Sequence, residues 1–263
     1  MTRAKLFAAL VVIVPAWAML PLGNQIYTEN VQLKYGTTHV TRELRDRIGQ
    51  GMAIALLAGF RGVVADFVWI ESHTFFEKRE WVRQYSDMQV AAILQPQSIL
   101  FWDMGSWHMA WNIGYAVSID PANRTKAEGI KRRREWWDKA RDFLERGIEN
   151  NPNQYDLYFK LGWLYQNKYE DYCKAEEYYG KAISFPDVPQ YVPRMYARAR
   201  EKCGDVLGAY KFWRDLWLVD HNKVDEPWSV IEREGKRLED VLKIPDDQRV
   251  FSHDAPKPAG PAS

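Results

Sequence analysis

The feature that most constrains the fold of this chain is a small residue that recurs inside segments crowded with large rings. Gly162 lies in the middle of "YFKLGWLYQ", residues 158–166, although glycine costs a helix about 1 kcal/mol relative to alanine. Ala175 precedes a second cluster of rings, and small residues recur among rings at Ala197 and Ala209, 35 and 34 residues further on. This spacing predicts helices that cross closely, with the rings filling the space around each crossing.

The spacing resembles the tetratricopeptide repeat (TPR), a pair of antiparallel helices with the pattern W-x2-L-G-x2-Y, then A-x3-F, then P, over 34 residues. One unit follows this pattern from Tyr158 and resumes at Ala175 as A-x3-Y; the next unit follows it through Ala197 and Ala209. The resemblance implies an all-α fold, a TPR-like α-solenoid of about four helix pairs over residues 65–223.

Two upstream units follow the pattern more weakly. The first starts at Val68 but carries the polar Glu71 where the pattern has leucine. The second contains Gly105, and its matching alanine, Ala140, comes 35 residues later, whereas the following unit needs only 13. We therefore expect an insert at about 116–135, since repeat arrays take insertions in loops. The small residues expected at the helix crossings are Gly105, Ala140, Gly162, Ala175, Ala197 and Ala209.

The segments that flank the repeats differ from them in composition. Residues 25–64 turn from charged to apolar and predict a linker and an N-terminal capping helix; a second membrane segment is the alternative. Residues 224–244 are amphipathic and predict a C-terminal capping helix. The proline- and alanine-rich residues 245–263 predict a disordered tail.

Residues 1–24 predict a membrane-directed N-terminus. Arg3 and Lys5 precede an uncharged apolar stretch, residues 6–22, which is close to the minimum of about 17 residues for crossing a bilayer. One interpretation is an uncleaved signal anchor in a bacterial inner membrane, single pass, with the repeats on the extracytoplasmic side. Another is a signal peptide cleaved near Ala18, which would give a secreted or periplasmic protein. An ordinary buried helix is a third, but it leaves the basic start unexplained.

No sequence motif predicts catalysis or a cofactor. GxSxG, HExxH and glycine-rich phosphate loops are absent, and a formal net charge of +1 gives the whole chain no electrostatic basis for binding nucleic acid. One alternative is a metal-dependent enzyme around His73 and His108, with Glu71 or Asp103 as a further ligand. We instead expect partly buried histidines, because these positions lack the tight spacing typical of metal sites.

The two cysteines, Cys173 and Cys203, are expected on neighbouring antiparallel helices. Cys173 would begin the second helix of one unit and Cys203 would end the first helix of the next, so both fall at one edge of the stack. A disulfide is consistent with this arrangement and with an extracytoplasmic compartment. Two unrelated thiols are the alternative, because the sequence does not fix side-chain direction.

The first helix of each unit is expected to line the concave side of the stack. Helical spacing predicts an aromatic groove there that becomes basic at one end, and tryptophan and arginine often anchor protein partners. The alternative is that the rings belong to the core, or that the insert folds back and fills the groove. The predicted groove residues are Trp69, His73, Phe76, Trp102, Met109, Phe159, Trp163, Arg194, Arg198 and Lys202.

A run of four cations, Lys131, Arg132, Arg133 and Arg134, forms a separate basic segment. It is a candidate contact for anionic lipid headgroups beside the predicted anchor, at about 1 kcal/mol per contacting residue. A solvated helix face is the ordinary interpretation of such a run.

The leading functional hypothesis is a membrane-tethered, extracytoplasmic TPR scaffold that binds a protein or peptide and catalyses no reaction. The stretches "GFRGVVADFVWIESHTFFE" and "WHMAWNIGYAVS" are also similar to a group of bacterial TPR proteins with a membrane-directing N-terminus, which implies no known reaction. The main rival is a structural subunit that is permanently integrated in a larger assembly.

Overall fold

The computed structural model describes residues 59–186, 188–219 and 227–251, and all regular structure within these ranges is helical. The all-α prediction is confirmed for them. The predicted membrane segment (1–24), most of the predicted N-terminal cap (25–64) and residues 252–263 of the predicted tail lie outside the described residues. No helix within the described ranges is both long and apolar enough to cross a bilayer.

The helices follow one another with short connections, and two of them contain π-helical turns (η1 and η2). In chain order the elements are α4 (Arg61–Glu77), α5 (Trp81–Leu94), α6 (Ile99–Trp107), η1 (His108–Ile113), α7 (Gly114–Ser118), α8 (Lys126–Asn150), α9 (Tyr155–Leu164), η2 (Tyr165–Tyr169), α10 (Tyr172–Ala182), α11 (Tyr191–Cys203), α12 (Val206–Val219), α13 (Pro227–Val241) and the 3₁₀ turn η3 (Asp246–Gln248).

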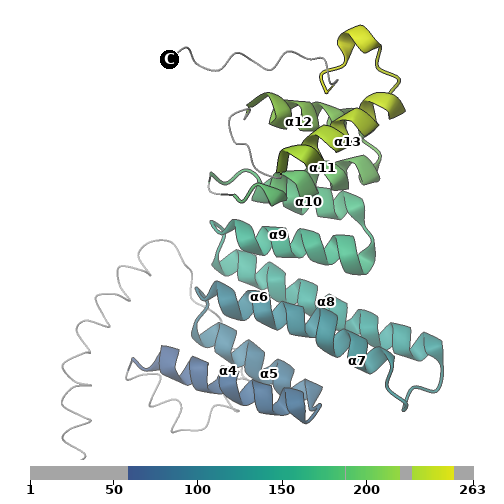
Figure 1. Ribbon diagram of the computed structural model, residues 1–263. Coiled ribbons are helices and arrows are strands. Elements are labelled where there is room, and N and C mark those ends of the chain that lie inside the picture. Colours follow the sequence, from purple (N-terminus) through teal and green to yellow (C-terminus); the bar gives the residue numbers. More distant parts are fainter. Residues whose placement is uncertain (1–58, 187, 220–226, 252–263) are drawn as a thin grey trace, which may run out of the picture.

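Consecutive helices form pairs, and the pairs are stacked in chain order (Figure 1). The first pair is α4 with α5, the third is α9 with α10, and the fourth is α11 with α12. In the second pair, α6, η1 and α7 form one continuous first helix that packs against α8. Each second helix also contacts the first helix of the next pair, so the buried residues form successive clusters along the stack.

Glycines lie where paired helices approach most closely. A Cβ on Gly162 of α9 would lie 2.8 Å from the Tyr179 ring of α10 and 3.2 Å from the Ala175 carbonyl oxygen. Gly105 of α6 faces the Phe143 ring of α8 in the same way, at 2.7 Å. The ring of the partner helix therefore explains why a glycine interrupts the aromatic stretch. The alanines expected at the crossings are all fully buried: Ala140, Ala175, Ala197 and Ala209.

The residues predicted as an insert mostly lengthen the two helices of the second pair. The first helix continues through η1 and α7 to Ser118, and α8, with 25 residues, already begins at Lys126. Asn123 Nδ2 donates to the Val117 carbonyl oxygen at 2.8 Å and holds the intervening turn against the helix end. The second pair therefore projects beyond the third at its α7 end (Figure 1).

Thr125 caps the first turn of α8. Its Oγ1 accepts a hydrogen bond from the Glu128 amide at 3.1 Å, and Glu128 Oε2 accepts one from the Arg124 amide at 2.8 Å. We expect Thr125→Ala to lower the free energy of unfolding by about 1 kcal/mol in urea titrations followed by circular dichroism. The control is Ser98→Ala, because Ser98 precedes α6 without a side-chain capping bond. Equal effects of the two substitutions would contradict the capping role.

The C-terminal end of the stack is covered by α13, which packs against α12. Glu234 of α13 pairs with Arg198 of α11 at 3.4 Å. The prediction that disorder begins at residue 245 is wrong for the described part of the tail. The Phe251 ring is buried, 5.5 Å from the Trp217 ring centroid, and fills the space over Gly235. Phe251 therefore extends the core beyond the turn that begins at Pro245.

Cys173 near the start of α10 and Cys203 at the end of α11 are joined by a disulfide, with their α-carbons 4.7 Å apart. The two helices also pack against each other along their length. The bond therefore connects the third pair to the fourth at one edge of the stack.

Candidate functional site

Two π-helical turns interrupt the first helices of the second and third pairs. η1 lies within the long helix, and η2 ends α9. Such turns are rare and frequently occur at functional sites. In η1, the Ala110 carbonyl oxygen accepts a hydrogen bond from Trp137 Nε1 of α8 at 3.2 Å. In η2, the Tyr165 carbonyl oxygen accepts one from the Asp171 amide at 3.1 Å. Each turn therefore has a carbonyl oxygen that accepts a hydrogen bond from a residue outside the turn.

Side chains of the two π-helical turns meet between the pairs. The ring of Trp111 in η1 lies 5.2 Å from that of Trp163 in α9, between centroids. Lys168 Nζ of η2 lies 4.4 Å from the centroid of Trp111. Because a π turn holds an extra residue, it rotates the side chains that follow it away from 3.6-residue spacing. Trp163 and Lys168 of the third pair both contact Trp111 of the second pair.

The rings continue from Trp163 toward the C-terminal pairs. The Phe159 centroid lies 6.5 Å from that of Trp163 and 5.2 Å from that of Tyr191 on α11. Tyr191 is 42% exposed, and the other rings are half-buried. We call Trp111, Trp163, Phe159 and Tyr191 the aromatic row. It crosses the first helices of three successive pairs.

At the N-terminal end of the stack, the Phe76 ring lies beside both histidines considered as metal ligands. Its centroid is 5.7 Å from that of His73 and 5.2 Å from that of His108. Burial lowers the pKa of His108, and the charge of His73 lowers it further. The phenyl ring therefore packs against both imidazoles. Within the described ranges, no group of three histidine, cysteine or acidic side chains is placed to hold a metal ion.

Two hollows lie at this N-terminal end of the stack. One of about 400 Å³ lies between α4 and His108. The other, of about 930 Å³, lies between the α4–α5 turn and α7. The walls of the larger hollow combine rings with charges, among them Trp81, Trp111, Tyr115, Arg79, Asp120 and Arg132. The projecting end of the second pair is therefore hollowed on the side that faces the first pair.

Two residues predicted to line the groove are core residues instead. Trp102 is 2% exposed, because its ring lies over Gly147 of α8, where a Cβ would come within 2.9 Å of it. Its Nε1 donates to the Pro96 carbonyl oxygen at 2.8 Å. Met109 is fully buried within η1. Both groove predictions are wrong, because the partner helix covers these positions.

The three cations predicted at the basic end of the groove have partners within the chain. Arg198 pairs with Glu234, and Lys202 donates to the Tyr172 hydroxyl at 3.0 Å, on the α10 side of α11. Lys202 therefore lies away from the aromatic row, contrary to the prediction. Arg194 bonds the Gln190 carbonyl oxygen at 3.3 Å, and burial together with the charge of Arg198 lowers its pKa. The remaining predicted groove residues are partly exposed and lie on first helices: Trp69, His73, Phe76, Phe159 and Trp163.

The run of four cations does not form one patch. Successive residues of a helix are rotated by about 100° from one another, so the four side chains point to different sides of α8. Arg132 pairs with Asp120 at 3.3 Å, and the Arg133 guanidinium lies 4.8 Å from the Trp137 ring centroid. Of the four, only Lys131 and Arg134 are exposed. A four-residue lipid contact is therefore incompatible with this helix geometry.

Sequence reasoning missed Trp111, Lys168 and the contact of Arg133 with Trp137. The sequence did carry a signal in its spacing. Trp107 and Trp111 are four residues apart, as are Arg133 and Trp137, so each pair of residues shares one helix face. The predicted register instead followed Trp102 and Met109, whose face of the helix is buried against α8.

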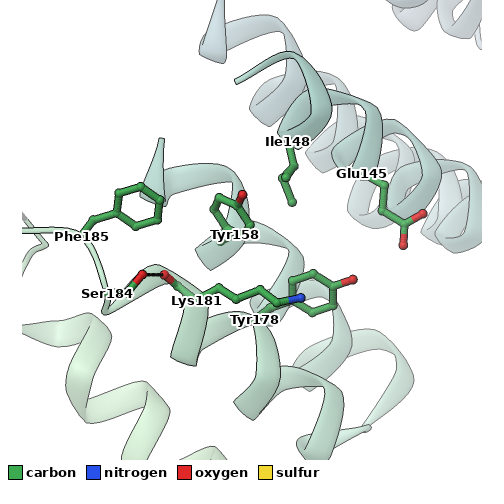
Figure 2. A pocket seen from close by; sticks show the side chains of 7 residues that line it. All are labelled: Glu145, Ile148, Tyr158, Tyr178, Lys181, Ser184 and Phe185. Atoms are coloured by element: carbon green, nitrogen blue, oxygen red, sulfur yellow. Dashed lines mark hydrogen bonds between the residues drawn. The ribbon is translucent and has the colours of Figure 1, made fainter. Parts of the chain in front are cut away.

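A further hollow, of about 450 Å³, lies on α8, α9 and α10 (Figure 2). The Tyr158 ring lies 5.7 Å from that of Phe185, and Lys181 Nζ lies 4.5 Å from the Tyr178 centroid. Glu145 stands at its border, and burial raises the pKa of this carboxyl. No residue of the aromatic row lines this hollow, so it is a separate feature of the stack.

No known protein-family pattern matches the chain, and no curated protein is significantly similar to it.

Proposed function

We propose that this chain is a membrane-tethered, extracytoplasmic scaffold of the TPR type that binds a protein partner along the aromatic row. The observation that carries the proposal is the row itself: Trp111, Trp163, Phe159 and Tyr191 contact one another in sequence across three pairs while remaining partly exposed. Partly exposed aromatic side chains on a rigid support are typical of the residues that dominate protein–protein binding. The stacked antiparallel pairs with glycine at their crossings support the TPR assignment.

The membrane tether and the compartment rest on residues 1–24, which combine a basic start with an uncharged apolar stretch. The disulfide between Cys173 and Cys203 supports an oxidising compartment outside the cytoplasm. Cleavage near Ala18 and an intact anchor differ in the N-terminal peptide of the mature protein, which mass spectrometry of the native protein would identify.

The test is affinity purification of the full chain from membranes in mild detergent, with mass spectrometry of the retained proteins. We expect the double substitution Trp111→Ala and Trp163→Ala to reduce partner recovery by about tenfold or more, since each is placed as a binding anchor. The matched control is Val82→Ala with Leu207→Ala, two exposed apolar residues on second helices. Thermal melts would establish that both variants are folded. Unchanged recovery in the tryptophan variant would contradict the proposal.

A second candidate function, a permanent structural subunit, is favoured by the outer face of α4. Phe67 and Ile70 are 68% and 65% exposed, and Val63, on the same helix face, is 51% exposed. Exposed apolar side chains grouped in this way mark surfaces that are covered in the assembled state. Co-purification in fixed stoichiometry that survives high salt, and that depends on Phe67 rather than on Trp163, would favour this alternative.

A further inference from the structure

Arg133 and Lys168 form a pair of half-buried cations at the step where the second pair projects beyond the third. Lys168 Nζ lies 4.4 Å from the Trp111 centroid and 6.0 Å from that of Trp137. The Arg133 guanidinium lies 4.8 Å from the Trp137 centroid. The two charges are therefore held around the same tryptophan by different pairs. We call Trp111, Ile130, Arg133, Trp137 and Lys168 the cationic shelf.

The two cations of the shelf have no anionic partner among the described residues. Neither takes part in any of the ion pairs found there, and the Arg133 Nε atom is buried without a hydrogen-bond acceptor. Burial, followed by the charge of Arg133, lowers the pKa of Lys168. Like charges held together and partly removed from water destabilise each other, and an anion between them would remove this cost. The tryptophan faces offset only part of it.

Apolar side chains lie on both sides of the two cations. Ile130, one helical turn before Arg133 on α8, is 53% exposed. On the other side, Trp111 leads into the aromatic row through Trp163. A bound segment that contacts Ile130 on one side and Trp111 on the other would therefore extend past the cations in both directions. This arrangement fits an acidic side chain within an extended segment rather than a free chain end.

We propose that the cationic shelf binds an extended segment of the partner protein, with one Asp or Glu side chain between Arg133 and Lys168 and apolar neighbours against Ile130 and Trp163. The inference rests on the proposed function and names the chemistry of its partner. A bilayer surface fits less well, because the shelf cations are recessed beside tryptophan rings, whereas the exposed Lys131 and Arg134 point elsewhere on α8.

The test starts with a selection from a random peptide library displayed on phage, using the full chain in phosphatidylcholine nanodiscs. The selected sequences should be enriched in Asp or Glu flanked by apolar residues. A synthetic selected peptide with an amidated C-terminus, titrated by fluorescence anisotropy, should bind about tenfold more weakly to Lys168→Gln. Replacing the acidic residue of the peptide by its amide should cause a similar loss, and the two losses should not add. Lys131→Gln is the charge-matched control and should bind like the wild type.

Three outcomes would overturn the inference. If peptide binding is lost in the Trp111→Ala, Trp163→Ala variant but unchanged in Lys168→Gln, the result would agree with the proposed function and contradict the acidic contact. If binding requires a free carboxylate at the peptide C-terminus, the two cations bind a chain end and not an acidic side chain. Nanodiscs that also contain phosphatidylserine would reveal a lipid site if they weaken peptide binding to the wild type but not to Lys168→Gln. A selection that does not distinguish the wild type from the Trp111→Ala, Trp163→Ala variant would instead contradict the proposed function.

Discussion

Replacing Cys173 and Cys203 together by serine should lower the free energy of unfolding by about 3–4 kcal/mol. The disulfide spans a sequence separation of 30 residues, and closing a loop of this length restricts the unfolded chain by roughly this amount. Urea titrations of the oxidised wild type and the double variant measure the difference. The wild type with dithiothreitol should behave like the variant, because reduction removes the same constraint.

The position of the disulfide also predicts how the stack unfolds. In a linear array each pair contacts only its neighbours, so a weakened interface between α10 and α11 uncouples the fourth pair and α13 from the rest. We expect the variant to lose hydrogen-exchange protection in α11 and α12 at a lower urea concentration than in α6 and α8. A single coincident transition at the wild-type midpoint would contradict this prediction.

Local spacing was sufficient to predict helices and the places where they cross. Gly105 and Gly162 are each opposed by a ring of the partner helix, and both were identified because a glycine inside an aromatic helix requires a reason. Ala175 and Ala209 followed from the same spacing, and both are buried. These features depend on contacts within a pair, where the repeat spacing itself places a small residue opposite a ring.

The candidate site was less predictable, because it depends on which face of a helix its partner covers and on contacts between successive pairs. Trp102 was expected to line the groove like Phe159, its counterpart one unit on, yet Gly147 admits its ring into the core. Ser106 and Met109 follow on the same helix face and are buried as well, whereas Trp111 contacts Trp163 of the next pair. A helical register counted from the sequence finds which residues share a face, but it does not find which face the partner helix covers.

The cations illustrate the same limit in electrostatic terms. Lys131 to Arg134 are contiguous in the sequence but lie on different sides of α8. Arg133 is instead close to Lys168, which comes from the next pair. Composition therefore identified a basic segment, while the half-buried pair of charges required the packing of two units to be known.

Replacing Gly162 by leucine should lower the free energy of unfolding by about 2 kcal/mol or more. A Cβ alone would lie 2.8 Å from the Tyr179 ring, which is fully buried and cannot move aside without disturbing both helices. Overpacking of this kind typically costs about 1–3 kcal/mol, and a leucine adds three further carbons. The gain in helix propensity, about 1 kcal/mol, offsets only part of the cost. Gly180→Leu is the control, because the nearest atom there belongs to the partly exposed Tyr196 ring, at 3.3 Å.

A double substitution separates the steric account from a general intolerance of position 162. Tyr179→Ala alone should cost about 3–5 kcal/mol, because it empties a large buried volume. When Gly162→Leu is combined with it, the leucine enters the space that the ring has left, so the pair should cost at least 1 kcal/mol less than the sum of the single substitutions. Urea titrations of the four proteins complete the cycle. Additive costs would mean that the ring does not require the glycine, and the physical basis for the repeated small residue would have to be sought in the Ala175 carbonyl, 3.2 Å from the same position.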